Sequence, residues 1–148
     1  MNILAQKVEL FVQDVERSAS FYVDVLGFER APTRTVMLAG QELVHAPLRN
    51  GPIMLGIGLL SRLPTEHYHR RAGSNAVLGL GVELCLYVAD SDLETWYARA
   101  KAAGAQFDRT GSEPLSMRPW GARDFRVLDP DGYYVRVTAP DRDFSAIP

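Results

Sequence analysis

The chain has 148 residues and a formal net charge of −2, and it is 47% hydrophobic and 23% charged, as in an ordinary soluble globular protein. The near-neutral charge and the lack of a basic run disfavour nucleic acid as a partner, and no apolar stretch approaches the roughly 18 residues of a membrane-spanning helix. Cys85 is the only cysteine, so no intrachain disulfide can form. Without a signal-peptide pattern at the start, these features predict a cytoplasmic protein.

The first half of the chain predicts a strand, a helix and three further strands. Residues 7–12 alternate between apolar and polar side chains, as expected of a strand. Asp14 is suited to cap the helix that follows, and Gly27 is suited to end it. The apolar stripe of this helix consists of Val15, Ala19, Tyr22, Val23 and Leu26. Short strands are predicted at residues 35–38, 42–46 and 53–57.

The second half predicts the same elements in the same order. Residues 83–88 form the opening strand, and Ser91 to Glu94 form a capping box at the start of a helix. The apolar stripe of this helix consists of Leu93, Trp96, Tyr97, Ala100 and Ala103. Further strands are predicted at residues 106–109, 123–128 and 134–138. The last two are joined by a tight turn at Asp129-Pro130-Asp131-Gly132.

The repeat predicts one pseudo-symmetric domain over residues 1–148, with its functional cleft where the two halves face each other. Each half is a βαβββ module, the first at about residues 5–60 and the second at about 82–140. A linker rich in Gly, Arg and His connects them at about residues 61–81. The polar tail from Pro140 is expected to pack loosely.

Three motifs resemble the vicinal oxygen chelate superfamily, which includes glyoxalases, extradiol dioxygenases, and fosfomycin-resistance and bleomycin-binding proteins. They are residues 11–28 at the start of module one, 93–104 in the second helix, and 119–132 at the closing hairpin. The resemblance covers nearly the whole chain. It implies an α+β fold in which paired βαβββ modules form a curled mixed β-sheet with helices outside, commonly as a homodimer.

The metal ligands of the superfamily can be compared position by position. Its enzymes commonly have His or Gln at the head of the first strand, His at the head of the second module, and Glu four residues after the glycine of the final turn. The corresponding positions are Lys7, Glu83 and Arg136. The position of module one that is equivalent to Arg136 is Leu55. Of these only Glu83 is a plausible ligand, so the sequence predicts neither a metal nor a cofactor.

Charge leads to the same expectation without the family. Protonated Lys7 and Arg136 repel a divalent cation, and Glu83 is expected to form a salt bridge with one of them. Such a cluster either orients the anionic group of a ligand or fastens the modules together, and the sequence leaves both readings open.

The remaining candidates favour structural roles. Cys85 lies between apolar neighbours and is expected to be inert core. His67 and His69 fit a solvated loop better than a metal pair, with a lid over the cleft as the minority reading. His45 is suited to line the pocket or to be satisfied by hydrogen bonds. Ser112 and Ser116 lack a neighbouring histidine and are read as loop residues.

The predicted ligand site follows from the two-residue period of the strands. Glu9 and Phe11 share a face with Lys7, Tyr87 shares one with Glu83, and Tyr134 shares one with Arg136. Trp120 lies at the mouth of the closing hairpin. The predicted ligand-binding residues are Lys7, Glu9, Phe11, Glu83, Tyr87, Trp120, Tyr134 and Arg136.

Aromatic walls around a few fixed charges suit a flat amphiphilic compound. The sequence therefore predicts a metal-independent binding protein, related to bleomycin and antibiotic resistance, that sequesters a small molecule and has no catalytic residue. The alternative is a metal-dependent lyase, isomerase or dioxygenase with ligands drawn from Glu83, His45 and His67 or His69. A weaker third reading is a metal-free enzyme with Glu83 as its base.

Overall fold

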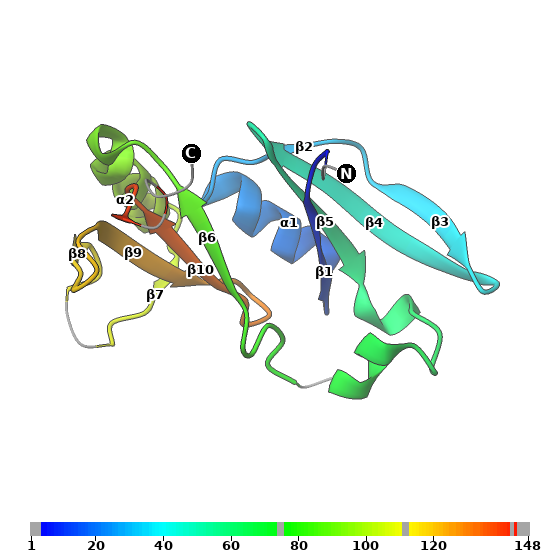
Figure 1. Ribbon diagram of the computed structural model, residues 1–148. Helices are drawn as coiled ribbons and strands as arrows, with labels where there is room; N and C mark the ends of the chain where they lie inside the picture. The colour runs from blue at the N-terminus through cyan, green and yellow to red at the C-terminus, as the bar shows by residue number, and fades with distance from the viewer. Residues whose placement is uncertain (1–3, 74–75, 111–112, 143, 145–148) are drawn as a thin grey trace. The chain divides into compact units, whose positions relative to one another are not determined.

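The computed structural model describes residues 4–73, 76–110, 113–142 and 144, in two compact units (Figure 1). Residues 1–78 form module one and residues 79–148 form module two, and each is described by itself. The fold is α+β, with one mixed five-stranded sheet in each module. The predicted linker is largely part of module one, because the short 3₁₀ helices η1 (Leu60–Arg62) and η2 (Tyr68–Ala72) both precede the boundary. That the modules make a single domain stays a prediction.

Module one follows the predicted order of elements, with one additional short strand. Its sheet has the order β1-β5-β4-β2, and β3 pairs with another stretch of β4. β1 and β5 run parallel, whereas the other pairs are antiparallel. The elements are β1 (Lys7–Val12), α1 (Val15–Asp24), β2 (Glu29–Arg30), β3 (Arg34–Leu38), β4 (Gln41–Asn50) and β5 (Ile53–Leu59).

Module two repeats this topology with the order β6-β10-β9-β7, and β8 pairs with β9. Ser116, expected in a loop, lies in β8, and Ser112 lies outside the described residues. The elements are β6 (Glu83–Tyr87), η3 (Asp90–Asp92), α2 (Leu93–Ala102), β7 (Gln106–Phe107), β8 (Ser116–Met117), β9 (Arg123–Leu128) and β10 (Tyr134–Thr138). Identical strand orders confirm the repeat.

The two helices begin differently. Asp14 caps α1 as predicted, accepting the backbone N–H of Arg17 at 3.0 Å, and Gly27 follows the helix with a φ of 63°. The capping box predicted for α2 is wrong: a 3₁₀ turn precedes the helix, and its N-cap Asp92 makes no side-chain capping bond. The carboxylate of Glu94 instead accepts a hydrogen bond from Arg123 at 2.9 Å. Glu94 therefore forms a long-range ion pair with Arg123 in place of the predicted local capping bond.

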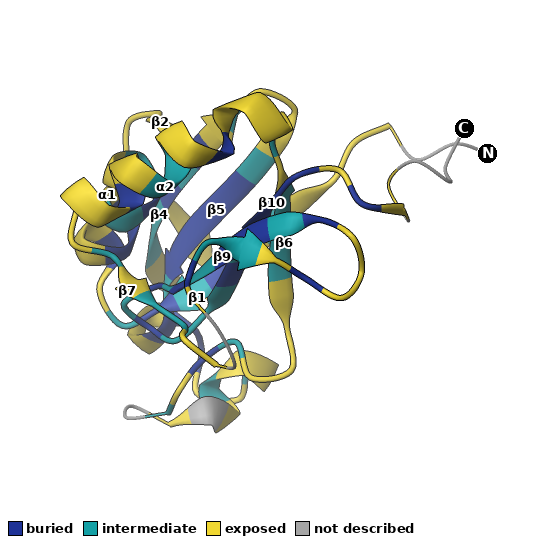
Figure 2. Cartoon of the chain, turned by 90° about the vertical axis from the view of Figure 1, so that its left-hand side faces the viewer, coloured by how far each residue is buried: buried dark blue, intermediate teal, exposed yellow. Residues whose placement is uncertain are grey.

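Each sheet has one buried face and one open face. In module one the buried side chains Leu10, Leu55 and Ile57 share the core with Tyr22 of α1. In module two, Phe125 and Val135 are fully buried, and Figure 2 shows β9 and β10 largely in the colours of buried and intermediate residues. The predicted helix stripes are buried or half-buried apart from Ala103, which is exposed and lies one residue after the end of α2.

The turn between β9 and β10 is as predicted. The Asp129 side chain accepts the backbone N–H groups of Asp131 and Tyr133 at 2.9 and 2.8 Å, and Gly132 has a φ of 90°. This turn sets the register of the last hairpin.

Register corrects one sequence alignment. Lys7 pairs with Met54, and Glu83 pairs with Tyr134, so the residue of module one equivalent to Arg136 is Gly56. Leu55, proposed from its distance to Gly51, points instead into the core with 2% exposure. The period of two makes a one-residue error a change of face.

Candidate functional site

The open face of module one has a cluster of three polar side chains from two strands. On β1, the ammonium of Lys7 forms a salt bridge with the carboxylate of Glu9. His45, on β4, places Nε2 at 3.0 Å from Glu9 Oε2 and at 3.4 Å from Lys7 Nζ. The Lys7 and Glu9 side chains are 37% and 40% exposed, so this is a solvated cluster. It can donate to or accept from a ligand by small movements.

Two glycines of β5 make room for this cluster. A Cβ at Gly56 would collide with the Glu9 carboxylate and the His45 imidazole. A Cβ at Gly58 would lie 3.0 Å from the Phe11 ring. Side chains from β1 and β4 therefore lie over the bare backbone of β5.

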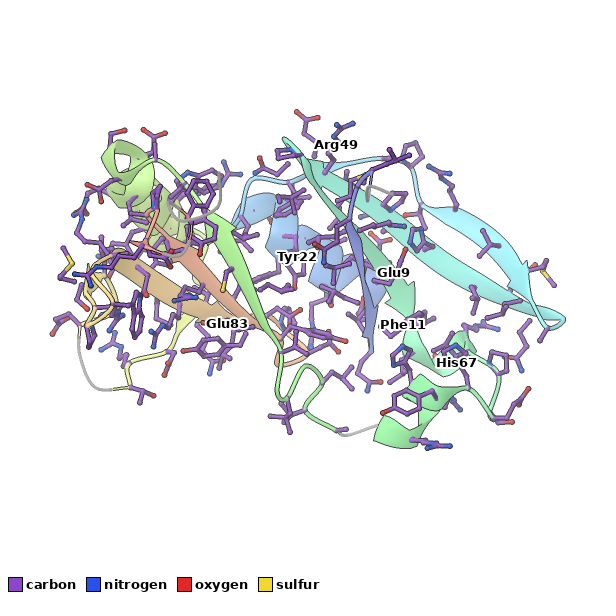
Figure 3. The ribbon with its side chains drawn as sticks, viewed as in Figure 1. Glu9, Phe11, Tyr22, Arg49, His67 and Glu83 are labelled. Carbon is purple, nitrogen blue, oxygen red and sulfur yellow. The ribbon has the colours of Figure 1, made fainter. Side chains whose placement is uncertain are left out.

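Phe11 is covered by residues of the linker. Its ring centroid lies 4.8 Å from that of His69 and 6.1 Å from that of His67, next to which Figure 3 shows it. The two imidazoles are 5.3 Å apart, and His67 Nδ1 accepts the backbone N–H of His69 at 3.3 Å. This segment is solvated as predicted at His69, which is exposed, while its rings also contact Phe11 at the end of β1. That it forms a lid over a cleft stays a prediction.

The open face of module two is built around Arg136 of β10. Its Nε lies 3.4 Å from Glu83 Oε1, which confirms one of the two predicted salt bridges. Its guanidinium also donates to Cys85 Sγ at 3.0 Å. Cys85 is half-buried on this face, not in the core as predicted, because it shares the side of β6 with Glu83. Burial raises the pKa of its thiol, and Arg136 opposes that effect only partly.

Trp120 lies under two guanidinium groups. The Cζ atoms of Arg126 and Arg136 are 5.2 and 5.5 Å from the centre of its indole ring, within the range of cation–π contacts. Beside them, Arg118 Nε donates to the fully buried carboxylate of Asp124 at 2.6 Å. Trp120 as a whole residue remains 39% exposed, so a ligand can reach it.

Two predicted tyrosines have partners. The Tyr134 hydroxyl donates to Asp108, and burial together with this bond raises the pKa of Tyr134 to about 12. The same bond lowers the pKa of Asp108. The Tyr87 hydroxyl donates to Asp141 at 3.2 Å, and its ring packs on Phe144 at 4.7 Å. The tail from Pro140 was expected to be loose, but these residues fasten its beginning to β6.

The predicted ligand residues thus fall into groups within each module. Lys7 contacts Glu9, and Arg136 contacts both Glu83 and Trp120. The sequence reasoning missed Asp124, Arg126 and Arg118. Asp124 and Arg126 alternate with the buried residues of β9, a signal that could have placed them on the open face.

The donors on these faces do not fit a divalent metal. Among the described residues, no group of three or more His, Cys, Asp or Glu side chains has the geometry to bind a metal ion. Glu9 and His45 lie within reach of the Lys7 ammonium, and Glu83 faces the Arg136 guanidinium. Tight sites need three or four neutral or anionic donors.

A duplicated α+β protein with polar open faces on both sheets is the class that the fold and the site define. The chain belongs to the Glyoxalase/Bleomycin resistance protein/Dioxygenase superfamily, whose family model matches residues 5–137. The match confirms the predicted family. No curated protein matches the chain.

Solved structures support the fold. TioX from Micromonospora sp. ML1 is 25% identical with a TM-score of 0.67, and the match covers 91% of this chain and 97% of that one. The lactoylglutathione lyase of Agrobacterium tumefaciens is 24% identical with a TM-score of 0.60 and 90% coverage of both chains. The fosfomycin resistance protein FosX of Listeria monocytogenes, solved with Mn(II) and sulfate, is 12% identical with a TM-score of 0.64 and 98% coverage of both.

None of the described helices of this chain is long and apolar enough to cross a membrane.

Proposed function

We propose that this protein binds a small amphiphilic or aromatic molecule on the open faces of its sheets, without a metal ion, and protects by sequestering it. The observation that carries the proposal is that the chain's own cations lie against its acidic groups. The Lys7 ammonium contacts Glu9, and the Arg136 guanidinium contacts Glu83. A fixed positive charge makes the binding of a divalent cation at the same carboxylate less favourable.

The chemistry of the faces supports an amphiphilic ligand. Trp120 offers an accessible aromatic surface, with Arg126 and Arg136 beside it as donors. A ring that stacks on the indole can place a carbonyl or an acidic group against a guanidinium. This arrangement needs no bond to be made or broken.

A metal-dependent lyase, isomerase or dioxygenase is the second candidate. The contact of 3.0 Å between His45 Nε2 and Glu9 Oε2 favours it, because imidazole and carboxylate are both common metal ligands. Rotation of Lys7 away from this pair would leave two donors.

Metal content separates the candidates. The purified protein is exposed to excess zinc, nickel and manganese, desalted and measured by elemental analysis. We expect less than about a tenth of an equivalent per chain, and about one equivalent would support the enzyme.

Ligand binding is then tested by fluorescence. The chain has two tryptophans, so the Trp96→Phe variant leaves Trp120 as the only reporter. Aromatic carboxylates are expected to quench this variant. The Trp120→Phe variant is the control, and equal quenching in both variants would contradict a ligand at Trp120.

We also propose that the protein is a homodimer. Exposed apolar side chains on β3, including Val36 at 47% and Met37 at 64%, are suited to an interface with a second copy. Light scattering after size exclusion is expected to give twice the chain mass of 16.4 kDa.

A further inference from the structure

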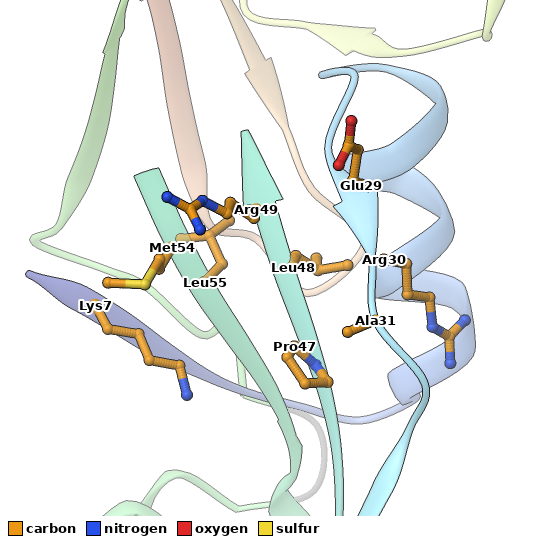
Figure 4. Close-up of a pocket in the computed structure, with 9 residues that line it drawn as sticks. All are labelled: Lys7, Glu29, Arg30, Ala31, Pro47, Leu48, Arg49, Met54 and Leu55. Atoms are coloured by element: carbon orange, nitrogen blue, oxygen red, sulfur yellow. The ribbon is translucent and has the colours of Figure 1, made fainter. Parts of the chain in front are cut away.

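Module one has a groove on its open face that the predicted ligand residues only partly describe. Its cavity volume is about 370 Å³, within the range of small-molecule sites. Pro47, Leu48 and Met54 supply much of its apolar lining, and Lys7 and Arg49 line it with charged side chains (Figure 4). All lie within residues 1–78, so the groove belongs to module one alone.

Arg49 is the cation of this groove that lacks an acidic partner among the described residues. Its side chain is exposed at the end of β4, and its Nε donates to the carbonyl oxygen of Gly51 at 2.9 Å. This bond uses none of the terminal guanidinium nitrogens. Figure 4 shows the guanidinium extending toward β5, beside Met54. Its terminal N–H groups are therefore able to meet a ligand that lies on Met54.

The other charges around the groove are engaged or directed elsewhere. Arg30 donates to both carboxylate oxygens of Glu16 at 2.6 Å, and this bond lowers the pKa of Glu16. Lys7 is neutralised by Glu9. Glu29 is the register partner of Arg49, but its carboxylate points away from Met54 in Figure 4.

We infer that this groove binds a small amphiphile with a single carboxylate group. The carboxylate lies against the guanidinium of Arg49, and the apolar body lies on Met54 and Pro47. A guanidinium presents parallel N–H donors that match the two oxygens of a carboxylate, and the thioether of Met54 adapts to varied apolar shapes. The inference rests on the proposed function, since it names the class of ligand that the open face of module one accepts.

The test uses the methionine methyl groups as reporters. Of the four methionines, Met54 lines the groove, Met37 is on β3 and Met117 is in module two. Protein labelled with ¹³C at the methionine methyls is titrated with octanoate, octan-1-ol and octylammonium, and Met54→Leu assigns the signal. We expect octanoate to move the Met54 signal and leave that of Met117 in place, and octylammonium to have no effect.

Substitutions then test the role of charge. Arg49→Gln is expected to weaken octanoate binding about tenfold while binding of octan-1-ol is unchanged, and Arg49→Lys is expected to recover part of the loss. Arg62→Gln, an exposed arginine of η1 outside the groove, is the matched control and should bind as the parent does. Because Arg49 is exposed, we expect the variant to fold, and an unchanged circular dichroism spectrum together with an unchanged signal of Met37, on β3 of module one, checks this.

Two results would overturn the inference. Equal binding of octanoate and octan-1-ol, in the parent and in Arg49→Gln, would show that Arg49 does not select the charge. A Met54 signal that no probe moves would show that the groove is not a ligand site. Neither result is the failure of the proposed function, which is read from Trp120 in module two. If aromatic carboxylates quench Trp120 while Met54 stays unmoved, only the inference falls.

Discussion

The two modules have the same topology, but β5 and β10 carry different residues on their open faces. Where β5 of module one has Gly56 and Gly58, the equivalent positions of β10 are Arg136 and Thr138. The Glu9 carboxylate, the His45 imidazole and the Phe11 ring, which come from β1 and β4, occupy the space over these glycines. In module two, β10 itself supplies the guanidinium of Arg136, which lies over Trp120. One scaffold thus carries its polar groups on the neighbouring strands in module one and on the last strand itself in module two.

Solvent exposure differs between one ion pair of each module. The side chains of the Lys7–Glu9 pair are 37% and 40% exposed, whereas those of Arg118 and Asp124 are 7% and 0% exposed. Exposed pairs contribute little to stability and rearrange easily, while a buried pair is costly to break. The Arg118–Asp124 pair of module two is therefore mainly structural, whereas the Lys7–Glu9 pair of module one is free to rearrange.

The largest effect is expected in the buried pair of module two. Asp124→Ala leaves Arg118 without its charged partner and should lower the free energy of unfolding by about 3–5 kcal/mol. Urea denaturation followed by circular dichroism measures this value. The double variant Arg118→Met/Asp124→Leu removes both charges and should recover much of the loss. A loss below about 1 kcal/mol in the single variant would mean that this pair contributes no more to stability than the solvated pair of module one.

A smaller effect is expected at the stacked guanidinium. Arg136→Met keeps the length of the side chain but removes its contacts with Glu83, Cys85 and Trp120. We expect a loss of about 1–2 kcal/mol and a shift of the Trp120 emission, measured in the Trp96→Phe background. The exposed Arg109→Met is the control. Unchanged emission would mean that the indole does not sense the guanidinium.

Alkaline pH tests the bond between Tyr134 and Asp108. Burial and the bond to Asp108 raise the pKa of folded Tyr134 to about 12, above its usual value of 10.0, so the protonated hydroxyl contributes stability below pH 10. That contribution, about 1 kcal/mol for a side chain that is only partly buried, is lost as the pH rises through about 12. Phenolate absorbance should show one tyrosine ionising last, and Tyr134→Phe should remove that step. A single uniform titration of all tyrosines would contradict the bond.

The smallest effect is expected in module one. Glu9→Gln should change the free energy of unfolding by less than about 1 kcal/mol, and the change should disappear at high salt, because the Lys7–Glu9 pair is exposed. Urea titrations at low and high ionic strength measure both quantities. A larger loss that persists in salt would remove the proposed difference between the two faces.

Much of the fold could be predicted from local patterns. The alternation at residues 7–12, the Asp14 cap and the turn ending in Gly132 each depend on neighbouring residues, and all three are observed. The repeat predicted two equivalent modules, and the strand orders agree. The short strands β2, β7 and β8 were missed or misjudged in length, because pairs of residues have too few positions to show a period.

The candidate site could be predicted only in part. The period of two placed Lys7 and Glu9 on one face. Charge predicted a salt bridge of Glu83 with either Lys7 or Arg136, and the structure shows the pair with Arg136. That these residues bind a ligand stays a prediction. Arg126 was missed, and the contact of the predicted Arg136 with Trp120 was not foreseen, because these contacts join β9, β10 and the loop before β9.

The sequence by itself determined the family, the duplicated modules and the alternation of faces along the strands, because these depend on short-range periodicity and on motifs. The tertiary structure alone decided which residues are opposite each other across strands. It assigned Gly56 rather than Leu55 to the open face, folded His67 and His69 onto Phe11, and left Arg49 beside a groove without an acidic partner among the described residues. Register and the path of a linker follow from contacts between distant segments, which no local pattern encodes.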